Sequence, residues 1–173
     1  MPVLIFKIKN YTNENVIENM VNYIAASPYI ECVGMSGCFL YPGQELPEGI
    51  SNAFNAVKNV YYKNDGQLIQ HIIIGLEDIE KVTENDAAII ATRISDYFFV
   101  RGYQTFWGLH YGSGGNESYR HIHLVINTIN GVTGLRYAPT YENMGDLKKF
   151  LEKLYTEYSW SYYTSESFYK EYE

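Results

Sequence analysis

Three of the four histidines in this chain, His110, His121 and His123, lie close together around a glycine-rich segment. Alternate residues of a strand point to one face, so His121 and His123 share a face with Val125 and Asn127. If residues 104–111 form the preceding antiparallel strand, joined through residues 112–119, His110 approaches the same spot. Three imidazole nitrogens then leave open coordination positions for substrate oxygens. The pattern predicts a metal site on a β-hairpin, with a chance cluster of structural histidines as the alternative.

The elements around this hairpin alternate between strand and helix patterns, with no internal repeat. We expect strands at 3–9 and 67–76 and a β-hairpin over 104–129. Helices are expected from Thr12 or Asn13 to about 26, at 51–61, from 84 to about 100 and at 143–158. Residues 31–49 hold several Gly and Pro residues, which predicts loop with short extended pieces. The fold class is α+β, with helices covering one face of a mostly antiparallel central sheet.

The clearest helix signal follows Thr83, which can cap a helix through Asp86, three residues later. The buried stripe of that helix is expected to comprise Ala87, Ile90, Ala91, Ile94 and Phe98. Met144, Leu147, Leu151 and Leu154 predict an amphipathic last helix in the same way. In the first helix Ile17, Met20, Val21 and Ile24 form the seam, and Tyr23 lies on its flank.

Length and composition predict one domain. The chain has 173 residues, of which 46% are hydrophobic, enough for a substantial core. We expect residues 1–160 to form this domain and the Tyr-rich residues 161–173 to form a tail that can pack on it. No signal peptide or membrane-spanning run is apparent, so a cytoplasmic location is expected. Cys32 and Cys38 predict two reduced thiols without an assigned function.

The formal charge of −7 argues against a generic nucleic-acid binder. The chain can still form a local basic patch, for which the candidates are Lys7, Lys9, Arg120 and Arg136. The alternative is that these four are ordinary solvated surface residues. Tyr111 can stack on bases. Trp107 can do so as well, but core packing is its more common role.

Three motifs in order give the chain a family resemblance. Met20-Val-Asn-Tyr23-Ile24 comes first, Gln70-His71-Ile-Ile-Ile-Gly75-Leu76 follows on a strand, and the third motif runs from His110 through His121-Ile-His123 to Asn127. Together they resemble the relaxases, the DNA-nicking mobilisation nucleases within the HUH endonucleases. The likeness covers roughly residues 1–158. It departs from one large class, which has serine near Gly75 and aspartate where this chain has Tyr111-Gly112.

The resemblance implies a reaction and its participants. Tyr23 would be the nucleophile that attacks one DNA strand at a transfer origin of a plasmid or mobile element, giving a reversible 5′-phosphotyrosine link. His110, His121 and His123 would hold one divalent metal. Mn²⁺ or Mg²⁺ is the family expectation, while imidazole ligands also suit Zn²⁺ or Ni²⁺. The partners would be single-stranded DNA and accessory relaxosome proteins, in a bacterial cytoplasm.

Several residues are candidates to support such a site. His71 can orient a ligand, contact DNA or be a satisfied core histidine, and Asn127 can bond backbone or a ligand. An acid can orient a metal-bound imidazole, and four candidates remain open: Glu77, Asp78, Glu80 and Glu117.

Two alternatives to a relaxase remain. In an HUH replication initiator or transposase the nucleophile follows the histidines on a helix, and Tyr155 or Tyr158 would then serve. In a degenerate, non-cleaving DNA-binding protein the histidines would be structural; the acidic charge and the missing family residues favour that alternative.

Overall fold

A computed structural model describes residues 4–7, 9–78, 81–113 and 116–158 of the chain. Its centre is a five-stranded antiparallel sheet in the order β1-β3-β5-β4-β2. The strands are β1 (Leu4–Lys7), β2 (Ile30–Ser36), β3 (Ile69–Asp78), β4 (Thr105–Ser113) and β5 (Asn116–Asn127). The helices are α1 (Val16–Ala25), α2 (Leu46–Val60), α3 (Glu84–Phe99) and α4 (Tyr141–Glu157). The predicted α+β class and central antiparallel sheet are confirmed.

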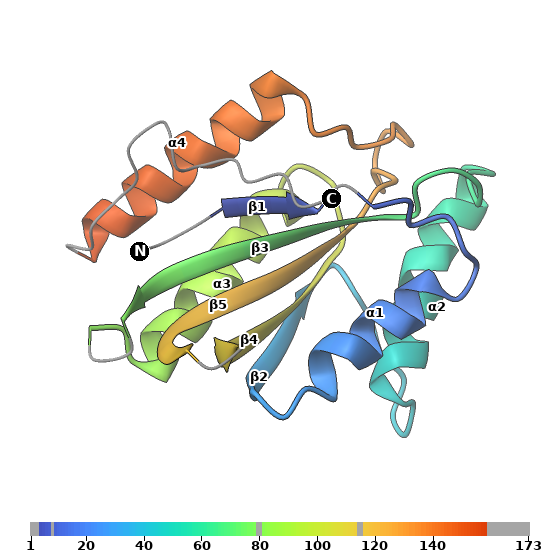
Figure 1. The fold of residues 1–173 in the computed structure, drawn as a ribbon. Coiled ribbons are helices and arrows are strands. Elements are labelled where there is room, and N and C mark those ends of the chain that lie inside the picture. Colours follow the sequence, from blue (N-terminus) through green and yellow to red (C-terminus); the bar gives the residue numbers. More distant parts are fainter. Residues whose placement is uncertain (1–3, 8, 79–80, 114–115, 159–173) are drawn as a thin grey trace.

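The helices lie on both faces of the sheet, so the expectation that they cover one face is wrong (Figure 1). α1 and α2 pack on the face that carries Ile69, Phe106 and Val125. α3 and α4 pack on the face that carries Ile122, Leu124 and Ile126. Alternate residues of β5 are therefore buried on opposite sides of the sheet. For this reason apolar residues occur at both odd and even positions of the strand.

The predicted loop with short extended pieces at 31–49 is only partly right. Ile30–Ser36 forms a full edge strand, β2, paired with β4, and α2 already begins at Leu46. Gly34 is one of the glycines that favour a loop at 31–49 in the sequence. The indole of Trp107 lies over this glycine, and a Cβ there would meet Trp107 Cζ2 at 2.3 Å. The glycine thus makes room for a neighbouring strand's side chain. Pro47 was also misleading, since it lies in the first turn of α2, where proline is tolerated.

Other boundaries follow local signals. Thr83 Oγ1 accepts a hydrogen bond from the Asp86 backbone N–H at 3.1 Å, as predicted, and the whole predicted stripe of α3 is buried. α1 begins at Val16, later than predicted, because residues 12–15 form a turn in which Asn13 Oδ1 accepts from Asn15 N. No helix in the described part of the chain is long and apolar enough to cross a membrane. The predicted tail, 161–173, lies outside the described residues.

Candidate metal centre and nucleophile

The hairpin of β4 and β5 brings three imidazoles together. His110 lies directly opposite His121 in the register, and His123 is two residues further along on the same face. All three side chains are buried, and one ligand nitrogen from each lies within 4.8 Å of the others. The described part of the chain offers no other such group of His, Cys, Asp or Glu. The geometry therefore has the convergence that the sequence pattern predicted.

The hydrogen bonds of these imidazoles show which nitrogens are free. His110 Nε2 lies 2.9 Å from the carbonyl oxygen of Ile24, and because a carbonyl only accepts, this nitrogen donates. The lone pair of His110 is then on Nδ1. His123 Nδ1 is bonded to His71 Nε2 at 3.0 Å, which leaves His123 Nε2 for another partner. His121 Nδ1 is buried without a hydrogen-bond partner among the described residues. A metal ion could be coordinated by the nitrogens that these hydrogen bonds leave available, so the residues fit the metal that the resemblance implies.

Burial keeps the cluster uncharged. It lowers the pKa of His121 to about 4, with the neighbouring His110 as the second cause. Burial also lowers the pKa of His110, against the opposing effect of the Ile24 carbonyl, and lowers that of His123 together with His71 and the other imidazoles. At neutral pH the three rings are therefore neutral ligands. Neutral imidazoles bind Mn²⁺, Ni²⁺ and Zn²⁺ more readily than Mg²⁺, which prefers oxygen.

Tyr23 lies beside this cluster. α1 buries Ile17, Val21 and Ile24 and leaves the Tyr23 side chain 64% exposed. The Tyr23 ring meets His123 edge to face, with centroids 5.9 Å apart. A tyrosine that packs on a helix flank would be covered, whereas this ring is open to solvent above the histidines.

A close contact between α1 and β4 sets this position. At Gly108 a Cβ would meet Ile24 Cγ2 at 2.3 Å, so the absence of a side chain lets α1 approach the strand. The same approach places the Ile24 carbonyl against His110. One glycine thus positions both the helix that carries Tyr23 and one of the histidines.

A cavity of about 300 Å³ adjoins Tyr23 on the β1 side. Its walls combine two lysines, two tyrosines and a histidine with apolar side chains: Lys7, Lys9, Tyr11, Met20, Tyr23, His71 and Ile73. No acidic residue belongs to this described lining. The two predicted DNA-contacting lysines therefore lie at one hollow with the predicted nucleophile.

The other predicted DNA contacts lie elsewhere. Arg120 forms a two-point ion pair with Glu31, at 2.7 and 2.8 Å, and also donates to the Val82 carbonyl at 2.5 Å. A phosphate would have to compete with that carboxylate. Tyr111 follows His110 on β4, so strand alternation turns it to the other face, where it meets Tyr29 with ring centroids 6.1 Å apart.

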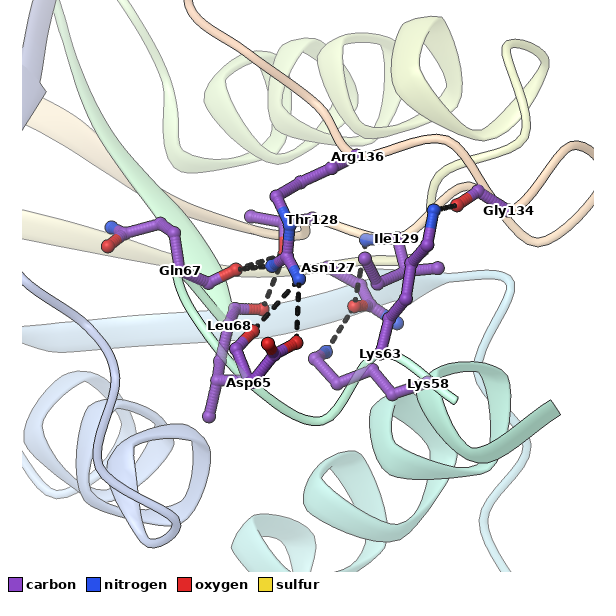
Figure 2. Close-up of polar contacts among 10 residues, drawn as sticks. All are labelled: Lys58, Lys63, Asp65, Gln67, Leu68, Asn127, Thr128, Ile129, Gly134 and Arg136. Atoms are coloured by element: carbon purple, nitrogen blue, oxygen red, sulfur yellow. Dashed lines mark hydrogen bonds and ion pairs between the residues drawn. The ribbon is translucent and has the colours of Figure 1, made fainter. Parts of the chain in front are cut away.

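Arg136 and Asn127 belong to a separate polar cluster at the far end of β5 (Figure 2). Arg136 donates to the backbone carbonyls of Gln67 and Asp65 and pairs with the Asp65 carboxylate at 3.5 Å. Asn127 Oδ1 accepts from Lys58, and its amide donates to Phe54 O at 3.1 Å. The structure thus gives both residues partners within the fold, away from the histidines.

Of the predicted supporting residues, His71 alone contacts the triad through a described side chain. The side chains of Glu77, Asp78 and Glu117 lie outside the described part of the structure, as does Glu80 altogether. Trp107 is buried in the core, which is the more common role of such a residue.

The alternative nucleophiles are on the wrong side of the sheet. Tyr155 is 1% exposed, belongs to the core between α3, α4 and the sheet, and donates its hydroxyl to the Gly75 carbonyl at 3.3 Å. Tyr158 packs against the same core. The histidines lie on the opposite face, with α1 and α2. The order seen in replication initiators therefore has no support in this geometry.

Sequence reasoning did not find Tyr11, Gly108 or the Ile24 carbonyl as parts of the site. Tyr11 is buried and its hydroxyl lies 3.4 Å from His71 Nδ1. All three act through contacts between distant segments, and no local pattern marks them. For Tyr11 the one available signal was its place shortly after the first strand, which many buried tyrosines share.

Comparison with known proteins identifies the family of the chain and agrees with its fold. A model of the relaxase family, described as MobA/VirD2-like nuclease domain, matches residues 31–160. The chain therefore belongs to this family, and it is a relaxase-type DNA nuclease. A solved structure reported as the molecular basis of vancomycin resistance transfer in Staphylococcus aureus has a similar fold, with a TM-score of 0.58 and 14% identity. The similarity covers 89% of this chain and 92% of that one. No curated protein matches the chain in sequence.

Proposed function

We propose that this domain nicks one strand of DNA at a transfer origin and joins the 5′ end covalently to Tyr23. The observation that carries the proposal is an exposed tyrosine ring 5.9 Å from His123, one of three buried histidines whose ligand nitrogens lie within 4.8 Å of one another. A nucleophile and a cation site are what phosphoryl transfer to an alcohol requires. The proposed nuclease unit is residues 1–160, because α1 and α4 pack on the same sheet.

The bond changes balance within the strand. The Tyr23 oxygen forms a bond to the scissile phosphorus while the bond from phosphorus to the 3′ oxygen breaks, and the phenolic proton is transferred away. The 3′ end leaves as a hydroxyl after taking up a proton. The phosphodiester energy stays in the tyrosine ester, so a 3′ hydroxyl can reverse the step and rejoin the strand.

The chain's own groups have defined parts in this scheme. His110, His121 and His123 would hold one divalent ion, which when bound would offset negative charge on a nonbridging phosphate oxygen. Lys7 and Lys9 line the cavity next to Tyr23 and would contact neighbouring phosphates of the strand. Arg120, Arg136 and Tyr111 do not line this cavity and are weaker candidates for these contacts.

A covalent-capture experiment tests the proposal without knowledge of the origin sequence. Wild-type protein with Mn²⁺ is incubated with a pool of single-stranded oligonucleotides that carry a random central region, then denatured, and strands attached to protein are sequenced. We expect attached strands to share one sequence and Tyr23→Phe to abolish attachment. Tyr62→Phe is the matched control, because Tyr62 is 92% exposed and lies after α2, outside the cavity lining.

Two outcomes would overturn the proposal. Equal attachment by Tyr23→Phe would exclude this nucleophile. Specific binding of a single-stranded sequence without any adduct, across several divalent metals, would instead indicate a non-cleaving DNA-binding protein.

A further inference from the structure

His71 is the fourth histidine of the chain, and it contacts the metal centre without belonging to the triad. It lies on β3, where Lys7 of β1 and Val125 of β5 are its cross-strand neighbours. Its Nε2 is 3.0 Å from His123 Nδ1, and the two rings stack with centroids 5.2 Å apart at 21°. All four histidines are therefore in one buried cluster.

Tyr11 continues the chain of contacts. Its hydroxyl oxygen lies 3.4 Å from His71 Nδ1. The backbone of Tyr11 is fixed on both sides, because its N–H donates to Gln67 Oε1 at 3.1 Å and its carbonyl accepts from Leu68 N at 2.9 Å. These bonds tie the segment after β1 to the start of β3, so the phenol is held against His71 by the fold.

The order of donors follows from the chemistry of neutral imidazole, which has one N–H and one lone pair. If His123 binds a metal through Nε2, its proton is on Nδ1 and donates to His71 Nε2. His71 then carries its own proton on Nδ1 and donates it to the Tyr11 oxygen. The Tyr11 hydroxyl remains free to donate toward the cavity that Tyr23 also lines. Once His123 binds a metal through Nε2, the donor and the acceptor of each hydrogen bond in this series are therefore fixed.

We propose that His71 and Tyr11 form a hydrogen-bonded relay that holds His123 with Nε2 toward the metal. The inference rests on the proposed metal site. In many metal centres a carboxylate or carbonyl takes this position behind a ligating histidine. Here a second imidazole takes it, and a phenol orients that imidazole in turn. His71 and Tyr11 are thus positioning residues, which act on the metal through His123.

The electrostatics agree with an uncharged relay. Burial, followed by the charges of Lys7 and Lys9, lowers the pKa of His71 to about 3. Burial, followed by Tyr23, raises the pKa of Tyr11 to about 12.

Calorimetric titration of metal-stripped protein with Mn²⁺ tests the relay directly. We expect His71→Ala to weaken Mn²⁺ binding by about 10- to 100-fold, the usual loss when a group behind a ligating histidine is removed. His71→Gln should recover part of this affinity, because its amide oxygen can still accept from His123. Tyr11→Phe should give a smaller loss, of about two- to tenfold, since it acts one bond further away.

Tyr137→Phe is the matched control. Tyr137 is also buried, and its hydroxyl has no hydrogen-bond partner among the described residues, but it belongs to the core on the opposite face. Removing that hydroxyl should leave Mn²⁺ binding unchanged. Nitrogen-15 NMR of the histidine side chains gives a second readout, in which metal-free wild type should show His123 protonated at Nδ1 and His71→Ala should lose this preference.

The outcomes separate the relay from the metal site itself. If wild type does not bind Mn²⁺, the proposed function fails before the relay is reached. If wild type binds and His71→Ala, folded as judged by its thermal unfolding, binds equally well, the relay is wrong. A change in unfolding temperature with unchanged Mn²⁺ affinity and an unchanged His123 tautomer would likewise overturn it and leave His71 a packing residue.

Discussion

The two ends of one face of β5 hold buried nitrogen groups of opposite character. At one end His121 and His123 present lone pairs to a shared centre, and no proton donor among the described residues meets His121 Nδ1. At the other end Lys58, which is 0% exposed, donates to the side-chain oxygen of Asn127 (Figure 2). The same strand alternation places both ends on the face covered by α1 and α2.

The two ends differ in whether their buried polar atoms have hydrogen-bond partners. Asn127 uses both halves of its amide: the oxygen accepts from Lys58 and Ile129 N, and the nitrogen donates to Phe54 O and Gln104 Oε1. That cluster is complete without a ligand and joins α2 to the sheet. In the histidine cluster, by contrast, the buried His121 Nδ1 has no hydrogen-bond partner among the described residues. Within a group of three convergent imidazoles, such an unpartnered nitrogen favours a site that binds a cation.

The largest effect should come from removing ligands. We expect wild type to bind a single equivalent of Mn²⁺ and His121→Ala combined with His123→Ala to abolish this binding, with a loss greater than the roughly 100-fold limit for supporting residues. Calorimetry measures the loss, and Lys58→Met, at the other end of β5, is the control that should keep wild-type affinity. Equal binding by the double variant would make the two ends of β5 alike, and the histidines would then be structural.

Lys58 offers the next largest effect, on stability. Burial, with the charge of Arg136 as the second cause, lowers the pKa of Lys58 from 10.5 to about 7. Between those values the unfolded chain holds a proton that the folded chain has released, so the free energy of unfolding rises with pH through this range and is lowest below pH 7. A shift of this size corresponds to about 5 kcal/mol at most, because one pKa unit is about 1.4 kcal/mol.

Lys58→Met should remove this dependence. Below pH 7 we expect a net stabilisation of about 1–3 kcal/mol, since the lost hydrogen bond to Asn127 offsets part of the gain. Denaturant unfolding of wild type and variant at pH 6, 7.5 and 9 measures the difference. If the two curves stay parallel across this range, Lys58 keeps its proton in the folded state, and its pKa is not lowered to about 7.

Gly108→Ala should have the smallest effect, and it tests the histidine end of β5 alone. The added Cβ would meet Ile24 Cγ2 at 2.3 Å, so α1 must shift away from β4. We expect about 1–3 kcal/mol of destabilisation from overpacking, measured by denaturant unfolding, together with reduced adduct formation by Tyr23. Gly145→Ala in α4 is the matched control, because a Cβ there meets nothing within 4 Å and should be neutral or slightly stabilising. Identical unfolding of the two variants would show that α1 tolerates the methyl group.

Local pattern was sufficient where one element decides the outcome. The period of two along residues 120–129 places His121, His123, Val125 and Asn127 on one face, and the pairing of His110 with His121 followed from a hairpin. The cap at Thr83 and the buried stripe of α3 are equally local. The edge strand β2 was missed because Gly34 is explained by Trp107, a residue on another strand.

The hairpin, the shared face of its histidines and the α+β class can all be predicted from the sequence, since periodicity and turn chemistry act over a few residues. The tertiary structure alone decided that helices cover both faces, that α1 sets Tyr23 beside His123, that Ile24 and His71 bond the far nitrogens of the ligands, and that Lys58 meets Asn127. These features depend on contacts between segments far apart in the chain, where side-chain volume and hydrogen-bond direction are fixed only when the sheet and its helices have packed.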